Sequence, residues 1–225
     1  MSKTIILLHG ALGSPIQFHA IQSELAHFDT HAIGFTGHMG GEPPKLSFDV
    51  FDRDIMNYLD SQQIETCSVF GFSMGGYAAM HLALSHPDRF EKIATLGTKF
   101  SWSLEESRKE AVKLHPQIVM EKVPQYADYL RSLHGMNWSD LMYRTAEMML
   151  DLGTGKALTM DDLGTINIPV TIGRGEKDRM ISLDESIEAS SALPQAKYVE
   201  LPDLVHPLER LDPKVVAQYI QRELG

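Results

Sequence analysis

The expected fold of this chain rests first on one stretch of sequence, Gly71-Phe72-Ser73-Met74-Gly75-Gly76. An apolar run, 67–70, leads into this stretch, and a run of small and apolar residues, 77–84, follows it. This order predicts a strand, a sharp turn with a serine at its apex, and a helix, which together direct the hydroxyl outward from the end of a sheet. The flanking glycines fit such a turn, because a Cβ at either place would meet the neighbouring backbone.

Outward from this turn, short apolar runs alternate with segments of helical spacing. Strands are expected at 5–8, 31–33, 67–70, 91–96, 169–173 and 197–201. Helices are expected at 15–26, 48–59, 75–85, 183–193 and 213–224. This alternation predicts an α/β fold, with a parallel sheet covered by helices on both faces. Ligands of such a sheet bind beyond the carboxyl ends of its strands.

The segment 101–163 has a different pattern. It contains no convincing strand, and it holds helical pieces at 104–114, 118–133 and 139–150, both tryptophans and six of the twelve methionines. We therefore expect residues 1–100 and 164–225 to form the core, and residues 101–163 to form a helical cap over an apolar pocket. Ordinary packing of the insertion against the core explains the same apolar residues equally well.

Two side chains further along the chain complete a chemical pattern with the serine. A serine hydroxyl needs a base within hydrogen-bond reach, and the base needs an orienting carboxylate. Asp178, after the strand at 169–173, is the expected acid, and Glu176 and Asp184 are weaker candidates. His206, after the last expected strand, is the expected base. The chain order of serine, acid and histidine fits a turn of this type.

Charge that develops on a reacting oxygen needs two hydrogen-bond donors, which backbone N–H groups usually supply. Met74 follows the serine at a helix N-terminus, where the dipole favours negative charge. The turn after the first strand is expected to supply the second donor, from Ala11 rather than Leu12. These assignments rest on main-chain groups, so the side chains there affect substrate shape more than chemistry.

Most of the other histidines have structural interpretations. His9 is expected to pack the first turn, and His86 to cap a helix or face solvent. His27, His31 and His38 have no carboxylate or cysteine at metal-ligand spacing, so neither a metal nor a cofactor is expected.

Net charge, cysteine content and the lengths of apolar runs narrow the expected binding partners and location of the protein. A formal net charge of −10 disfavours nucleic acid and anionic membranes, whose phosphates would be repelled. The single cysteine, Cys67, can form no intrachain disulfide and is expected to be buried and inert. The apolar run at 5–8 is too short for a signal-peptide core or a membrane span. We therefore expect a cytoplasmic monomer or homodimer that acts on a small molecule with an apolar portion.

Four motifs together resemble the α/β-hydrolase superfamily: His9-Gly10, the stretch 71–76, Gly175-Glu-Lys-Asp178 and Val205-His206, in the family's order. The likeness covers nearly the whole chain. It implies the α/β-hydrolase fold, a Ser73/Asp178/His206 triad and a lid formed by the insertion. Small bacterial carboxylesterases, enol-lactonases and carbon–carbon bond hydrolases are the most similar members.

The chain departs from the family pattern in three places. The first turn arrives at residue 9, which implies a sheet shortened to about six strands. Val205 stands where the family has a glycine before the histidine. The turn after the second strand keeps only Gly34-Phe-Thr-Gly-His38-Met of the family's motif.

Several functions are compatible with these residues. The favoured one is a cofactor-independent serine hydrolase that cleaves a small ester, lactone or thioester through an acyl-enzyme. Carbon–carbon bond hydrolysis, or a lyase or synthase step, on the same triad is an alternative, and so is a non-catalytic ligand-binding protein. A nucleotide-binding protein is disfavoured, because the first turn lacks G-x-G-x-x-G and the chain has no loop with G-K-[ST].

Overall fold

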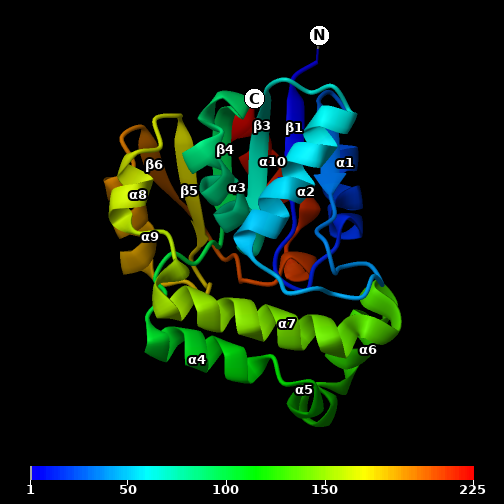
Figure 1. Ribbon diagram of the computed structural model, residues 1–225. Coiled ribbons are helices and arrows are strands. Elements are labelled where there is room, and N and C mark those ends of the chain that lie inside the picture. The colour runs from blue at the N-terminus through cyan, green and yellow to red at the C-terminus, as the bar shows by residue number, and fades with distance from the viewer. Residues whose placement is uncertain (1) are drawn as a thin grey trace.

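A computed structural model describes residues 2–225, and its centre is a parallel sheet (Figure 1). Within these residues the sheet has six strands in the order β2-β1-β3-β4-β5-β6. The strands are β1 Thr4–Leu8, β2 Asp29–Ile33, β3 Cys67–Phe72, β4 Phe90–Leu96, β5 Val170–Gly175 and β6 Ala196–Leu201. Every neighbouring pair is parallel, so the carboxyl ends of all the strands meet at one edge. The expected fold class and strand number are confirmed.

Helices cover both faces of the sheet, because apolar residues of the strands point to both sides. The helices α2 (Phe48–Ser61), α3 (Met74–Ser85) and α9 (Leu183–Ala192) bury side chains in one apolar cluster. The helices α1 (His19–Glu24) and α10 (Pro213–Leu224) pack together and share a second cluster on the opposite face. No helix within residues 2–225 combines the length and apolar character needed to cross a membrane.

The chain between β4 and β5 is helical. Its helices are α4 Leu104–Lys113, α5 Pro116–Lys122, α6 Pro124–His134, α7 Trp138–Asp151 and α8 Met160–Gly164. Figure 1 shows α4 to α7 lying across the carboxyl ends of the strands, the edge where ligands of parallel sheets bind.

Two expected helices are divided, and one of the divisions falls at a proline. The expectation of one helix at 118–133 is wrong, because the chain breaks between α5 and α6 at Val123. Pro124 has no N–H to donate and excludes the helical conformation at the residue before it. The helix expected at 15–26 begins as a 3₁₀ turn, Pro15–Phe18, before α1.

Cys67 lies at the start of β3 and is buried, as expected from the sequence. Burial raises the pKa of its thiol to about 12. The thiol is therefore protonated at neutral pH and is a poor nucleophile.

The turn between β3 and α3 is as tight as the glycine spacing predicts. Ser73 has a φ of 51° and a ψ of −117°, a strained conformation for a residue with a side chain. A Cβ on Gly71 would overlap the backbone of Gly76, and a Cβ on Gly75 would overlap the carbonyls of Leu8 and His9. The glycines therefore let the start of α3 lie directly against the end of β1.

This geometry predicts that Gly71→Ala destabilises the protein, because the new methyl group has to displace backbone. We expect the free energy of unfolding in urea to fall by about 1–3 kcal/mol or more. Gly41→Ala is the control, since a Cβ at Gly41 meets nothing within 4 Å. Equal urea midpoints for the two variants would contradict the steric account of this turn.

Candidate active site

Four loops bring the candidate residues to one edge of the sheet. Ser73 follows β3, Asp178 follows β5, His206 follows β6, and Ala11 follows β1. Ser73, Met74, Ala11 and His206 line one pocket at this edge, and Asp178 lies behind the histidine. Residues far apart in the sequence thus meet, because parallel strands end side by side.

The imidazole of His206 is held by the carboxylate of Asp178. The distance from His206 Nδ1 to Asp178 Oδ2 is 2.8 Å. With the Nδ1 proton directed at the carboxylate, Nε2 is free to accept a proton. The ring of Phe72 lies 5.3 Å from the imidazole, between ring centres. Gly97 has a φ of 65°, and a Cβ there would lie 3.3 Å from both Asp178 Oδ2 and His206 Nδ1. The glycine therefore leaves room for this pair.

Asp178 is 5% exposed and remains ionised in this setting. Burial raises the pKa of Asp178, but the hydrogen bond with His206 and those from two backbone N–H groups lower it by more. These N–H groups, of Met180 and Ile181, lie 2.8 and 3.1 Å from Oδ1. The pKa is therefore below its usual value, and the carboxylate can stabilise a protonated imidazole.

The two weaker acid candidates do not form this contact with His206. Glu176 instead accepts a hydrogen bond from the backbone N–H of Asp203, at 3.0 Å, and so fixes the loop before the histidine. Asp184 is exposed in the first turn of α9.

The loop before His206 accommodates Val205 without a left-handed residue at that place. The left-handed residue is Asp203, with a φ of 62°. The side chain of Val205 packs against the apolar cluster beneath α10. The departure from the family's glycine therefore has a local structural explanation.

Ser73 and His206 line the same pocket without a direct hydrogen bond between the hydroxyl and the ring, among the bonds found within residues 2–225. The carbonyl of Ser73 accepts a hydrogen bond from Thr98 Oγ1 at 3.0 Å, which fixes the backbone of the turn. Contacts between a nucleophile and its base are often long before substrate binds and shorten in the reacting complex.

Two backbone N–H groups at this edge are available as donors. Met74 is the first residue of α3, so its N–H has no acceptor within the helix. Neither this N–H nor that of Ala11 has an acceptor among the hydrogen bonds of the described chain. The helix dipole adds positive potential at Met74.

The pocket walls are mainly apolar and come from both parts of the chain. Trp102, Met148, Met149 and Leu152 contribute from the segment between β4 and β5. Apolar side chains of the rest of the chain complete the wall, namely Phe48, Tyr77, Met180 and Ile181.

Lys99 also lines the pocket, and the sequence pattern did not single it out. Its side chain is 11% exposed, with Nζ at 3.4 Å from Glu106 and 3.7 Å from Glu185. Its position three residues after β4, at the edge where ligands bind, is the signal that could have marked it.

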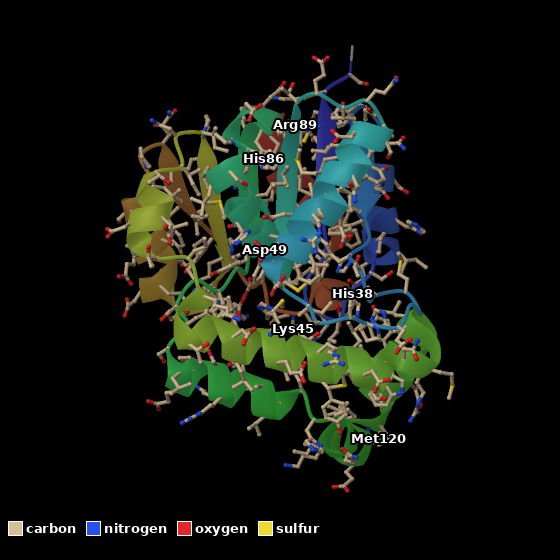
Figure 2. The ribbon with its side chains drawn as sticks, viewed as in Figure 1. His38, Lys45, Asp49, His86, Arg89 and Met120 are labelled. Carbon is tan, nitrogen blue, oxygen red and sulfur yellow. The ribbon has the colours of Figure 1, made fainter. Side chains whose placement is uncertain are left out.

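His9 lies beneath the first turn as a neutral ring. It is fully buried, its Nδ1 lies 2.8 Å from the carbonyl oxygen of Gly10, and its Nε2 accepts from Phe35 N–H at 3.4 Å. Burial lowers the pKa of His9 to about 4. His38 lies where the core meets the helical segment (Figure 2). Burial lowers its pKa too, and so does the repulsion that a proton on His38 would meet from a protonated His9 or His134. His86 lies near Arg89 at the opposite end (Figure 2).

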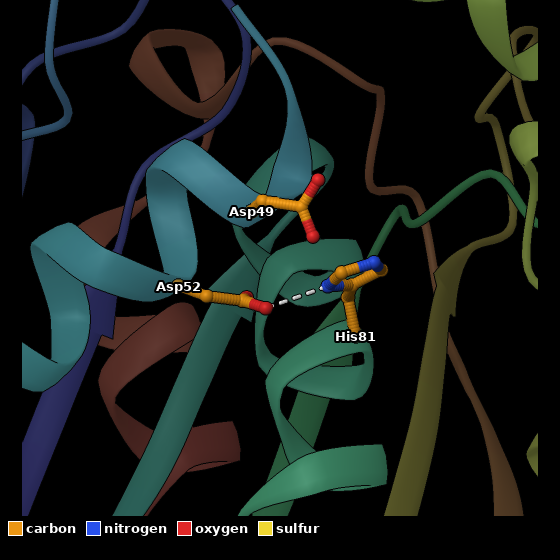
Figure 3. Close-up of side chains that lie close together, drawn as sticks. All are labelled: Asp49, Asp52 and His81. Carbon is orange, nitrogen blue, oxygen red and sulfur yellow. Dashed lines mark hydrogen bonds and ion pairs between the residues drawn. The ribbon is translucent and has the colours of Figure 1, made fainter.

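One group of side chains among residues 2–225 has the spacing of a metal site (Figure 3). The ligand atoms of Asp49, Asp52 and His81 lie within 4.8 Å of one another. His81 Nδ1 lies 2.7 Å from Asp52 Oδ2, and this contact joins α3 to α2. The contact accounts for two of the three side chains, and the third, Asp49, is exposed.

Comparisons with known proteins identify the same fold. The sequence profile of the alpha/beta hydrolase fold family matches residues 3–117. The sn-1-specific diacylglycerol lipase ABHD11 of Danio rerio is 31% identical over 103 residues, which are 42% of this chain and 31% of that protein. The match therefore spans about a third of that relative's length.

Two further relatives match over most of their length. The pimeloyl-[acyl-carrier protein] methyl ester esterase of Chromobacterium violaceum is 25% identical over 227 residues, covering 90% of this chain and 86% of that protein. The crystal structure of the enol-lactonase from Burkholderia xenovorans superposes with a TM-score of 0.81 at 21% identity, covering 100% of this chain and 92% of that one. The chain belongs to the alpha/beta hydrolase fold family.

The buried neutral histidines predict an acid-sensitive fold. A histidine whose pKa is lowered in the folded state binds its proton more readily when unfolded, so stability falls as pH drops from about 6.5 toward 4. For His9 alone we expect a loss of roughly 2 kcal/mol between pH 7 and pH 5.

Urea unfolding of the unchanged protein and of His9→Gln at both pH values measures this loss. We expect the difference in unfolding free energy between the two pH values to shrink in His9→Gln. The control is His19→Gln, at an exposed residue of α1. An undiminished difference in His9→Gln would show that His9 does not carry the effect.

Proposed function

We propose that this protein is a serine hydrolase that cleaves a small ester, lactone or thioester with an apolar acyl portion. The observation that carries the proposal is the 2.8 Å contact between His206 and Asp178, at the wall of the pocket that Ser73 also lines. In this proposal Ser73 is the nucleophile, His206 the base and Asp178 the orienting acid.

The reaction would proceed in two halves. The Ser73 hydroxyl oxygen bonds to the substrate carbonyl carbon while its proton passes to His206 Nε2, and the carbonyl electrons move onto the oxygen. The N–H groups of Met74 and Ala11 stabilise that oxyanion. Collapse breaks the bond to the leaving group, which takes the proton from His206. Water then repeats the sequence on the acyl-enzyme and releases the acid.

Residues 101–163 would act as a cap on a core formed by residues 1–100 and 164–225. Two contacts support this interpretation. The Tyr77 hydroxyl accepts a hydrogen bond from the backbone N–H of Leu158 at 2.6 Å, and Lys45 forms an ion pair with Asp151 at 3.2 Å. The apolar side chains that this segment adds to the pocket would exclude water from the acyl group and favour an apolar substrate.

The relatives support a hydrolase by their names, since one is a lipase and another a methyl ester esterase. The catalytic assignment itself rests on the geometry of Ser73, His206 and Asp178 in this chain.

We expect a fluorophosphonate probe to label Ser73, because an activated serine attacks phosphorus as it attacks a carbonyl. Intact-mass and peptide mass spectrometry would locate the label. Ser73→Ala should abolish labelling, whereas Ser101→Ala, at an exposed serine, should retain it. Label on another residue, or label that persists in Ser73→Ala, would refute the nucleophile assignment.

We expect Asp178→Asn to lower kcat by about 10³–10⁴ on an activated ester, because the amide no longer holds His206 in the correct tautomer. Asp184→Asn is the matched control, and its kcat should stay within about twofold of the unchanged protein. Steady-state kinetics on the two variants decides between the candidate acids. A larger loss in Asp184→Asn would reverse the assignment.

A further inference from the structure

His134, the last residue of α6, contacts the turn that carries Ala11. The ring is 1% exposed. Its Nε2 lies 2.8 Å from the carbonyl oxygen of Leu12, and its Nδ1 accepts from the backbone N–H of Met39 at 3.1 Å. A carbonyl can only accept and a backbone N–H can only donate, so Nε2 carries the proton and Nδ1 does not. Burial lowers the pKa of His134, which favours this neutral form.

The hydrogen bond from His134 reaches Ala11 through two peptide units. In a trans peptide the C=O and the N–H point in opposite directions, so fixing one fixes the other. The Leu12 carbonyl shares a peptide unit with the Gly13 N–H, which donates to the Gly10 carbonyl at 3.0 Å. The Gly10 carbonyl shares a peptide unit with the Ala11 N–H. No peptide bond of the described chain is cis.

Two further features describe the conformation of this turn and the contacts that hold it. Leu12 has a φ of 57°, in the left-handed region that a leucine rarely adopts. His9 Nδ1 donates to the same Gly10 carbonyl at 2.8 Å, so that oxygen is held from two sides. Hydrogen bonds in such a chain also polarise one another, which strengthens the last donor.

We infer that His134 is a positioning residue that aligns the Ala11 N–H for the oxyanion. This inference rests on the proposed function, because it assigns a task within the same site. Its consequence is that α6 completes the oxyanion site through the turn after β1, although the residues that line the pocket come from other elements. The Ala11 donor is then aligned only while α6 is seated against the turn.

The test compares His134→Phe with Asn137→Ala. The phenylalanine keeps an aromatic ring and removes both hydrogen bonds. Asn137→Ala removes another contact between the same helical segment and the neighbouring loop, the 3.1 Å bond from Asn137 Nδ2 to the Gly40 carbonyl, without touching the turn. His134→Gln retains a donor and an acceptor and serves as the rescue variant.

Steady-state kinetics on an activated ester gives the first readout. We expect His134→Phe to lower kcat roughly ten- to hundredfold with KM changed by less than about threefold, since a misaligned donor costs less than a missing one. His134→Gln should recover most of kcat, and Asn137→Ala should stay within about twofold of the unchanged protein. The affinity for a phenylboronic acid, which forms a tetrahedral adduct with an active serine, should fall in parallel with kcat.

Equal losses in Asn137→Ala and His134→Phe, or an unaltered kcat in His134→Phe, would overturn the inference. If circular dichroism shows that His134→Phe is unfolded, nitrogen-15 NMR of the unchanged protein decides instead. A proton on Nε2 of His134, with a shift on addition of the boronic acid, supports the inference, and a proton on Nδ1 overturns it.

Failure of the proposed function has a different signature. In that case the unchanged protein neither hydrolyses the ester nor reacts with a fluorophosphonate. If the unchanged protein hydrolyses the ester and reacts with the fluorophosphonate, and His134→Phe has the same kcat, the proposed function stands. Only the positioning task of His134 is then wrong.

Discussion

The close approach of the start of α3 to the end of β1 is the constraint on which the site depends. Gly75 lies against the carbonyls of Leu8 and His9, and any side chain there would separate the two elements. Because the two elements touch, Met74 and Ala11, whose backbone N–H groups are the proposed oxyanion donors, lie in neighbouring turns at the pocket wall. Ser73, in the turn before α3, has a strained conformation with a φ of 51°.

The topology of the parallel sheet brings the acid and the histidine of the site together. Each strand ends at the same edge, so the loops after β5 and β6 bring a carboxylate and an imidazole together although they are 28 residues apart. Hydrogen bonds from Met180 and Ile181 hold the carboxylate, and Gly97 leaves room beside it. The carboxylate is thus fixed by backbone contacts before any substrate arrives, and such preorganisation favours electrostatic stabilisation of a transition state.

Much of this could be predicted from the sequence, because its signals are local. The glycine spacing around Ser73 reports a steric need within six residues, and alternating apolar runs report the strands. The division of the helix at Pro124 was also readable, since a proline excludes the helical conformation before it. The role of His134 could not be predicted from the sequence, because this residue contacts a carbonyl 122 residues away and no local pattern marks such a partner.

The central claim is that Ser73 attacks and that Met74 and Ala11 hold the resulting oxyanion. A crystal structure of the phosphonylated protein tests it most directly. The account predicts phosphorus bonded to the Ser73 hydroxyl oxygen, with the phosphonyl oxygen about 2.7–3.1 Å from both backbone nitrogens. A phosphonyl oxygen directed away from both nitrogens, or phosphorus on another residue, would contradict it.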